Sequence, residues 1–201
     1  DDVVYWDSEK IGRLAHSAEV VNLNEPGGSM DQYSSAIGGL IYLQTKSLTS
    51  IENLDCSLGS FIIGDSNQSK ETLNILTRCK NARLKIIDFL KTKIPSLGLS
   101  SCHFDEIKSY LNRDQFILME GTLKNRDLLK EALRILKKDV LDHSRFGNML
   151  LMEHGILRDV LNVSTPKLEK MLTAAMNAGA LGGKITGSGG GGCMFFYVSE
   201  N

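Results

Sequence analysis

The sequence predicts an α+β fold, because stretches with helical periodicity are mixed with a few short apolar stretches and do not alternate regularly with them. The chain has 201 residues, of which 42% are hydrophobic and 23% are charged, a composition typical of a globular protein with a buried core. The stretch "CMFFYV" (193–198) near the C-terminus is rich in aromatic and β-branched side chains and is predicted to be a strand.

Apolar spacing places most of the predicted helices. The stretch "SEKIGRLAHSAEVVN" (8–22) has apolar residues at helical spacing, and Ser8 is its expected N-cap. Pro95 is expected to stop a long helix, because proline cannot continue the helical hydrogen bonding. The other helices of this kind are predicted at 31–39, 70–94, 104–111, 125–141 and about 147–161.

The last predicted helix, in "STPKLEKMLTAAMNAG" (164–179), has signals at both ends. Thr165 is the expected cap, Pro166 takes the first helical position, and Gly179 follows the helix end. The remaining strands are predicted in the short apolar stretches "LIYLQ" (40–44), "FIIGD" (61–65) and "KIT" (184–186).

Charge and cysteine usage exclude several classes of protein. The net charge is −1 without basic clusters, so neither nucleic acid nor a membrane surface is an expected partner. The N-terminal "DDVVYWDSEK" is acidic and polar, unlike a secretory signal. Four cysteines lie far apart in the sequence and are expected to be free thiols in a reducing compartment. We therefore expect a cytoplasmic protein.

A run of glycines precedes the last predicted strand. Gly187, Gly189 and Gly192 match the pattern G-x-G-x-x-G of a dinucleotide-binding turn. Such a turn must open a helix, whose N-terminus holds the pyrophosphate, whereas a strand follows here. The run is also unlike a Walker A loop, since no Lys-Ser or Lys-Thr pair ends it. We predict a strand–turn–strand unit, used either for a tight connection or for close approach of a loop or a ligand.

The sequence allows two alternative roles for each of two carboxylates, Glu19 and Asp31. Glu19 shares the helical stripe of Ile11 and Ala15, so it is either an exposed residue at the edge of this stripe or a carboxylate that is paired or bound to a cation. Asp31 opens the short helix of small residues. It is either a helix cap, with Ser34 three residues on, or a carboxylate that orients or deprotonates a substrate hydroxyl.

These segments together resemble a known family. "AEVVNLNEPGGSMDQYSSAIGGLIYL" resembles the galactokinase-type GHMP kinases, in which an Ala-Glu pair precedes "MDQ" by the interval found here from Glu19 to Asp31. "LRDVLNVSTPKLEKMLTAAMNAGALGGKITGSGGGGC" resembles the C-terminal motif of this family and the helix before it. The resemblance covers essentially the whole chain. It implies the end of an N-terminal kinase domain at 1–59 and, at 60–201, a C-terminal domain of helices packed on a small antiparallel sheet.

The resemblance implies an ATP-dependent kinase that transfers the γ-phosphate to a hydroxyl of a small molecule, specifically a sugar. Asp31 matches the catalytic aspartate of the family, and Glu19 matches a glutamate that helps to hold Mg²⁺. Lys184 to Gly192 match the motif that supports the phosphate-binding loop. ATP and Mg²⁺ are the implied cofactors, and the sugar is the implied partner. The residues expected to support the phosphate loop are Gly187, Ser188, Gly189, Gly190 and Gly191.

The chain departs from the family pattern in two ways. The main ATP loop of the family and its N-terminal sugar motif should lie upstream of Glu19, so we expect the C-terminal part of a longer kinase, inactive by itself. In galactokinases a basic, tyrosine-containing helix start follows the strand that resembles "FIIGDSN", whereas this chain has "QSKETLNILTR". Galactose is therefore not singled out, and a heptose, a uronic acid or another sugar is equally compatible.

Two other functions remain open from the sequence. The first is a non-catalytic relative that senses a sugar and a nucleotide and binds a transcription regulator. The second is a helical interaction domain with a glycine-hinged hairpin, in which Glu19 and Asp31 would face different surfaces. The histidines show no metal-ligand spacing and are expected to be structural or on the surface, at His16, His103, His143 and His154.

Overall fold

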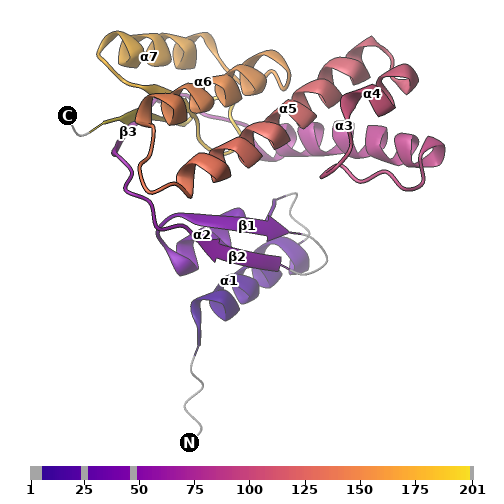
Figure 1. Cartoon of the computed structure of the whole chain (residues 1–201), viewed down its shortest axis with the longest axis horizontal. Coiled ribbons are helices and arrows are strands. Elements are labelled where there is room, and N and C mark those ends of the chain that lie inside the picture. The colour runs from indigo at the N-terminus through magenta and orange to yellow at the C-terminus, as the bar shows by residue number, and fades with distance from the viewer. Residues whose placement is uncertain (1–5, 24–26, 46–48, 200–201) are drawn as a thin grey trace, which may run out of the picture. The chain divides into compact units, whose positions relative to one another are not determined.

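The computed structural model describes residues 6–23, 27–45 and 49–199 (Figure 1). The chain divides into two compact units, residues 1–56 and 57–201. Within the described ranges, none of the helices has the length and apolar content that a membrane crossing requires. The cysteines are free thiols, as predicted.

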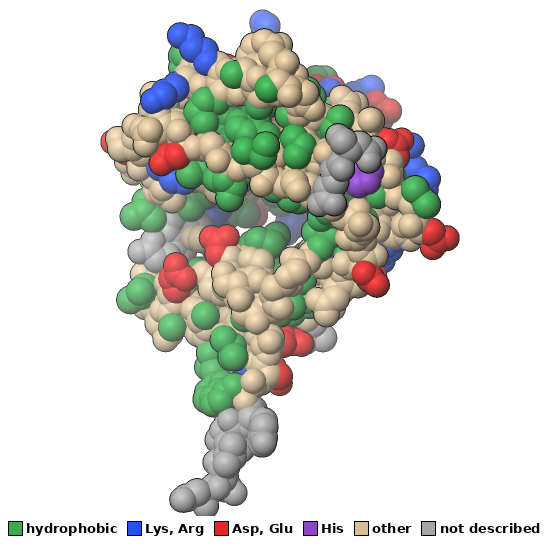
Figure 2. Space-filling model, turned by 90° about the vertical axis from the view of Figure 1, so that its left-hand side faces the viewer, with side chains coloured by type: hydrophobic (Ala, Val, Ile, Leu, Met, Phe, Trp, Pro, Cys, Tyr) green, Lys and Arg blue, Asp and Glu red, His purple; other side chains and the backbone are tan. Residues whose placement is uncertain are grey.

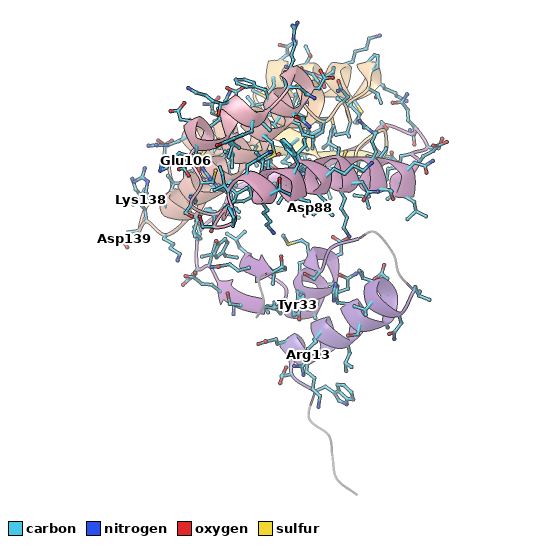
Figure 3. The ribbon with its side chains drawn as sticks, turned by 90° about the vertical axis from the view of Figure 1, so that its right-hand side faces the viewer. Arg13, Tyr33, Asp88, Glu106, Lys138 and Asp139 are labelled. Atoms are coloured by element: carbon cyan, nitrogen blue, oxygen red, sulfur yellow. The ribbon has the colours of Figure 1, made fainter. Side chains whose placement is uncertain are left out.

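The first unit contains two packed helical segments and a β-hairpin. Helix α1 (Ser8–His16) continues into the π-helical segment η1 (Ser17–Asn22), and helix α2 (Met30–Ile37) packs against α1. Tyr33 is buried between α1 and α2 (Figure 3), so close to Gly12 that a Cβ there would lie 2.8 Å from Tyr33 Cδ1. Strands β1 (Ile41–Thr45) and β2 (Thr49–Asn53) form the antiparallel hairpin.

Two details of the first unit differ from the prediction. Asp7 caps α1 by accepting a hydrogen bond from the amide of Lys10 at 2.6 Å, and Ser8 is the first helical residue instead of the cap. Strand β2 was not predicted, because "TSIEN" has a single large apolar residue and its partner strand supplies the pairing.

The second unit consists of helices packed on a small antiparallel sheet, as predicted. The three-stranded sheet has the order β3-β5-β4 and is formed by β3 (Ser60–Asp65), β4 (Gly182–Ile185) and β5 (Cys193–Val198). The helices are α3 (Thr72–Lys93), α4 (Phe104–Ile107), the 3₁₀-helix η2 (Lys108–Tyr110), α5 (Arg113–Leu136), α6 (His143–Asp159) and α7 (Pro166–Asn177).

Helix α5 begins at Arg113 instead of residue 125. Asn112 and Gln115 form a capping box in which each side chain accepts from the other's backbone amide, and this box starts the helix earlier than the apolar spacing indicated. Helix α6 likewise begins at His143, because Asp142 caps it through the amide of Arg145 at 2.9 Å. The helix predicted at 104–111 is one α-helical turn followed by η2.

Buried side chains in the described part of the second unit form one group that joins α3, α4 and α5, and another group that joins α7 to the sheet. Helix α7 follows its prediction at both ends, with Thr165 accepting from the amide of Leu168 and with Gly179 at a φ of +100°. Hydrophobic side chains also gather on one face of this unit (Figure 2). Ile62 and Met171 help to line an apolar groove of about 340 Å³ between β3, β5 and α7.

Candidate functional site

Glu19 and Asp31 line the same hollow in the first unit. This carboxylate hollow has a volume of about 380 Å³ and lies between α1–η1 and α2. Its lining residues are Ile11, Ala15, Glu19, Asp31, Gln32, Ser35 and Ala36. The predicted stripe of Ile11, Ala15 and Glu19 therefore faces one hollow, and Asp31 is brought to it from the neighbouring helix. This placement argues against an interaction domain in which the two carboxylates face different surfaces.

Asp31 is not the cap of α2. The cap position is Ser29, and Asp31 lies in the first helical turn, where the partial positive charge of the helix N-terminus favours a carboxylate. The Ser34 hydroxyl donates to the backbone oxygen of Asp31 at 3.3 Å, so this hydrogen bond does not use the carboxylate of Asp31. Within the described part of the chain, this exposed carboxylate has neither a hydrogen-bond partner nor an ion-pair partner.

Gln32 connects the two helical segments beside these carboxylates. Its side-chain Nε2 donates to Glu19 Oε2 at 2.7 Å, which ties the π-helical segment to α2. Its Oε1 is buried and has no donor among the residues that the structure describes. An acceptor oxygen without a donor is costly in the interior, so this atom is suited to a hydroxyl, a cation or its hydration water.

The carboxylate hollow fits Mg²⁺ by its chemistry. In the described ranges no three His, Cys, Asp or Glu side chains gather to form a closed metal site. Mg²⁺ in phosphoryl-transfer sites usually takes one or two carboxylates and completes its shell with water and phosphate oxygens. Glu19 and Asp31, with the free acceptor of Gln32, meet this requirement.

The glycine turn (residues 186–192) connects β4 and β5 of the second unit as an antiparallel hairpin, which confirms the predicted strand–turn–strand unit. Positive φ angles occur at five of its residues, namely Gly187, Gly189, Gly190, Gly191 and Gly192. A Cβ at Gly189 would lie 2.5 Å from the backbone oxygen of Val163. The turn therefore needs glycine both for its backbone conformation and for its close packing.

Two amides of the glycine turn anchor it to neighbouring loops. Gly190 N–H donates to the Val163 carbonyl at 2.7 Å, and Gly192 N–H donates to the Gln68 carbonyl at 3.0 Å. Thr186 N–H donates to the Cys193 carbonyl at 3.1 Å within the hairpin. Among the described residues, the amides of Gly187, Ser188, Gly189 and Gly191 have no hydrogen-bond partner in the protein. Free amides of a glycine-rich turn are donors for an anion.

Lys70 lies along the glycine turn, and the sequence alone did not single it out. A Cβ at Gly192 would lie 3.4 Å from Lys70 Nζ, and one at Gly187 would lie 3.6 Å from it. Its position in the polar segment between β3 and α3 was the available signal, but the pairing of β3 with β5 is needed to bring this segment to the turn. Lys70 thus adds a cation beside the free amides.

Two cations near this region are already engaged. Arg78 on α3 donates to the backbone oxygen of Leu161 at 3.0 Å. Lys184 at the start of the implied motif forms an ion pair with Glu153 at 2.8 Å. Neither side chain is therefore free for an anion at the glycine turn.

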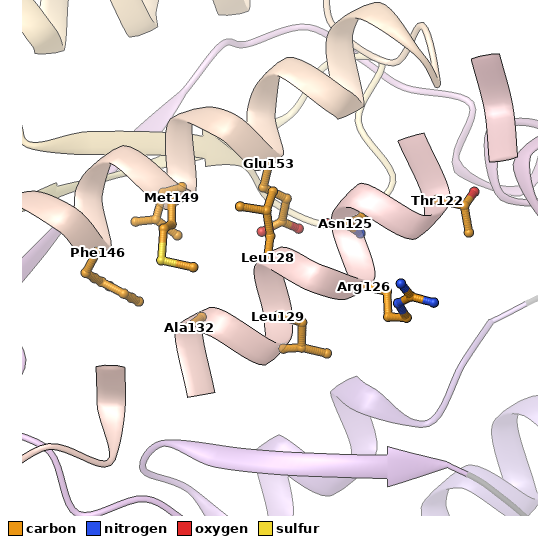
Figure 4. A pocket seen from close by; sticks show the side chains of 10 residues that line it. Thr122, Asn125, Arg126, Leu128, Leu129, Ala132, Phe146, Met149 and Glu153 are labelled. Atoms are coloured by element: carbon orange, nitrogen blue, oxygen red, sulfur yellow. The ribbon is translucent and has the colours of Figure 1, made fainter. Parts of the chain in front are cut away.

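A further hollow of about 350 Å³ lies between α5 and α6 (Figure 4). Leu128, Phe146 and Met149 give it an apolar wall, and Arg126 and Glu153 are its charged residues. Arg126 donates to backbone oxygens of the α3–α4 connection, and Glu153 pairs with Lys184. Because both charges are satisfied, this hollow provides no reactive group.

The fold of helices packed with small antiparallel sheets is that of galactokinase and mevalonate kinase. Lactococcus lactis galactokinase complexed with galactose matches with a TM-score of 0.75 at 17% identity, over 98% of this chain and 53% of that chain. L. major mevalonate kinase in complex with R-mevalonate matches with a TM-score of 0.60 at 16% identity, over 98% and 52%. At this level of identity the comparison shows the fold.

The resemblance to the GHMP kinases is confirmed, because residues 129–201 match the family model described as "GHMP kinases C terminal". The mevalonate kinase of Thermococcus gammatolerans is 31% identical over 96% of this chain and 49% of its own length. The galactokinase of Fusobacterium nucleatum is 27% identical over 97% and 52%. The chain thus carries a GHMP-kinase C-terminal domain, has mevalonate kinases and galactokinases as homologues, and spans about half the length of these curated relatives.

Proposed function

We propose that this chain is part of an ATP- and Mg²⁺-dependent kinase that transfers the γ-phosphate of ATP to a hydroxyl of a small molecule. The observation that carries the proposal is the convergence of Glu19 and Asp31 on one hollow, in a chain whose residues 129–201 match the C-terminal domain of the GHMP kinases. The end of the N-terminal kinase domain, which the resemblance places at residues 1–59, would then include the first unit.

Asp31 is assigned to the acceptor hydroxyl. Its carboxylate is exposed in the hollow and has no competing partner among the described residues, so it can accept the hydroxyl proton and orient the attacking oxygen. Glu19, held by Gln32, would contribute a carboxylate oxygen to Mg²⁺, which supplies charge neutralisation for the phosphate oxygens when bound. Positioning and charge neutralisation account for most of the catalysis of phosphoryl transfer.

The glycine turn is assigned to phosphate support. The free amides of Gly187, Ser188 and Gly189 can donate to anionic oxygens, and Lys70 adds a positive charge next to them. The residues that the resemblance implies also include Gly190 and Gly191, whose positive φ angles the turn requires.

For the substrate we propose a sugar, with mevalonate as the second candidate. The galactokinase relatives and the resemblance favour a sugar, whereas the T. gammatolerans mevalonate kinase favours mevalonate. Both substrates present a hydroxyl, so the role of Asp31 is the same for either one. We also infer that the enzyme acts in the cytoplasm, in line with its free thiols.

The test is an assay of the protein that contains this chain, with ATP, Mg²⁺ and a panel of galactose, a heptose, a uronic acid and mevalonate. We expect phosphorylation of one substrate, and a loss of at least about 100-fold in kcat for Asp31→Asn. Asp55→Asn, an exposed aspartate of the same unit outside the carboxylate hollow, is the matched control and should keep full activity.

Full activity of Asp31→Asn, with the fold checked by circular dichroism, would refute the role of that residue. Binding of ATP and a sugar without turnover would instead favour the non-catalytic sensor. The panel thus separates the kinase from the non-catalytic sensor.

A further inference from the structure

An ionic cluster around the buried His154 joins α6 and α7 of the second unit. His154 is 1% exposed, and its Nε2 is 2.8 Å from Glu169 Oε1. The same carboxylate accepts hydrogen bonds from the Ser164 hydroxyl and from Arg158 Nη1, the latter at 3.3 Å. Glu169 therefore connects α6, α7 and the α6–α7 connection (residues 160–165) through one side chain.

The hydrogen bonds keep this carboxylate charged. Burial raises the pKa of Glu169, but the hydrogen bonds from Ser164 and His154, the charge of His154 and the bond from Arg158 together hold the pKa below its ordinary value. Three hydrogen bonds to one carboxylate hold its position relative to its partners. The cluster therefore fixes the position of Ser164.

Ser164 is adjacent in sequence to the residue on which the glycine turn rests. The carbonyl of Val163 accepts the hydrogen bond of Gly190 N–H at 2.7 Å. The position of a Cβ at Gly189 would be 2.5 Å from the same oxygen, so the turn packs on this carbonyl without spare room. A shift of the α6–α7 connection must therefore displace the glycine turn.

We propose that Glu169 is a positioning residue for the glycine turn, which it acts on through Ser164 and the Val163 carbonyl. The inference rests on the proposed function for one point only, namely that the glycine turn supports phosphate. The positioning itself is a property of the chain and can be measured without any substrate.

The hairpin contains an internal reference amide. Thr186 N–H donates to the Cys193 carbonyl at 3.1 Å, inside the hairpin of β4 and β5. Gly192 N–H is unsuitable as a reference, because it donates to the backbone oxygen of Gln68, whose side chain accepts a hydrogen bond from Thr165 of the α6–α7 connection at 2.7 Å. Loss of positioning should therefore loosen Gly190 and leave Thr186 in place.

The experiment measures amide hydrogen exchange of Gly190 and Thr186 by NMR in the ¹⁵N-labelled chain. Ser164→Ala removes the link between Glu169 and the connection, and we expect exchange at Gly190 to accelerate about tenfold, the effect of losing one hydrogen bond to a charged group. Exchange at Thr186 should change less than about twofold. Glu169→Gln should act in the same direction.

Asp159→Asn is the matched control. Asp159 also binds Arg158, at 2.7 Å, but has no hydrogen bond to Ser164 or His154. Its replacement should leave the ratio of the exchange rates at Gly190 and Thr186 unchanged. Equal acceleration at both amides in Ser164→Ala would show general destabilisation and overturn the proposal, and so would no change at either amide.

The experiments distinguish a failure of the positioning role of Glu169 from a failure of the proposed kinase function. If the Gly190 response occurs but the wild-type protein transfers no phosphate to any substrate, the positioning holds and the kinase assignment falls. If the protein is an active kinase and Gly190 does not respond, the positioning is wrong. In an active kinase, Ser164→Ala should also raise the KM for ATP by more than it lowers kcat.

Discussion

The backbone oxygen of Gly147 on α6 lies where a Cβ atom at Gly182 on β4 would be. A Cβ at Gly182 would lie 1.9 Å from this oxygen, and a Cβ at Gly147 would lie 2.4 Å from the backbone oxygen of Leu181. Helix α6 therefore packs directly on the backbone of the strand that leads into the glycine turn. Neither residue can be replaced without moving one backbone away from the other.

Gly147→Ala should destabilise the second unit by about 2 kcal/mol or more, because backbone atoms on both sides prevent relaxation. Gly155→Ala on the same helix is the control, since nothing lies within 4 Å of its Cβ position. That substitution should stabilise the protein by about 0.5–1 kcal/mol through helix propensity. Urea denaturation of both variants measures the difference, and similar midpoints would contradict the close packing.

Gly189→Ala should be more harmful than Gly187→Ala, although both residues have positive φ angles, +76° and +63°. Each alanine incurs the left-handed backbone strain of about 1–2 kcal/mol. Only at Gly189 does the methyl group also meet the Val163 oxygen, whereas at Gly187 the nearest atom is Lys70 Nζ at 3.6 Å. We expect a difference of at least about 1 kcal/mol in the free energy of unfolding. Equal losses would mean that strain alone explains the glycines.

Glu131 should make stability depend on acid pH. The hydrogen bond from Arg134, opposed by desolvation and aided by the charges of Arg134, Arg145 and Lys138, lowers the pKa of Glu131 from 4.5 to about 2. Because the folded state has the lower pKa, the stabilisation is complete above about pH 5 and is lost as the pH falls toward 2. Glu131→Gln should therefore be less stable than the wild type at pH 7 and equally stable near pH 2, as thermal melts can measure. A difference that does not vary with pH would refute this role.

Arg126 should hold the connection between α3 and α4 to α5. Its Nη1 donates to the backbone oxygens of Leu99 at 2.7 Å and Cys102 at 2.6 Å. Arg126→Met should cost about 1.5–3 kcal/mol and expose residues 94–103 to limited proteolysis. Lys124→Met on the same helix removes only an exposed ion pair with Glu120 and should cost less than about 0.5 kcal/mol. Unchanged proteolysis in Arg126→Met would exclude the tether.

The sequence was most informative where local chemistry decides the structure. Helix α7 was predicted closely, because Thr165, Pro166 and Gly179 each act on their own neighbours. The start of α5 was not predicted, because the capping box of Asn112 and Gln115 lies upstream of the apolar residues whose helical spacing indicated a helix at 125–141. The same spacing did place the Glu19 side chain correctly with Ile11 and Ala15, despite the change to π-helical winding.

The parts of the site that depend on tertiary contacts could not be predicted. Lys70 reaches the glycine turn only because β3 pairs with β5, and nothing in its local sequence indicates this. The cluster of His154 and Glu169 likewise needs α6 and α7 to pack, and the expectation of a structural role for His154 did not include its partner. Long-range pairing brings such residues together, and periodicity does not report it.

The anchored backbone of the glycine turn has a consequence for the entropy of ligand binding. Glycine loses more conformational freedom on ordering than any other residue. Here that freedom is already lost on folding, through the bonds of Gly190 and Gly192 to the carbonyls of Val163 and Gln68 and through the bond from Ser66 N–H to Gly192 O. An anion that takes the remaining amides would meet an ordered backbone, so its affinity would not be reduced by the cost of ordering the chain.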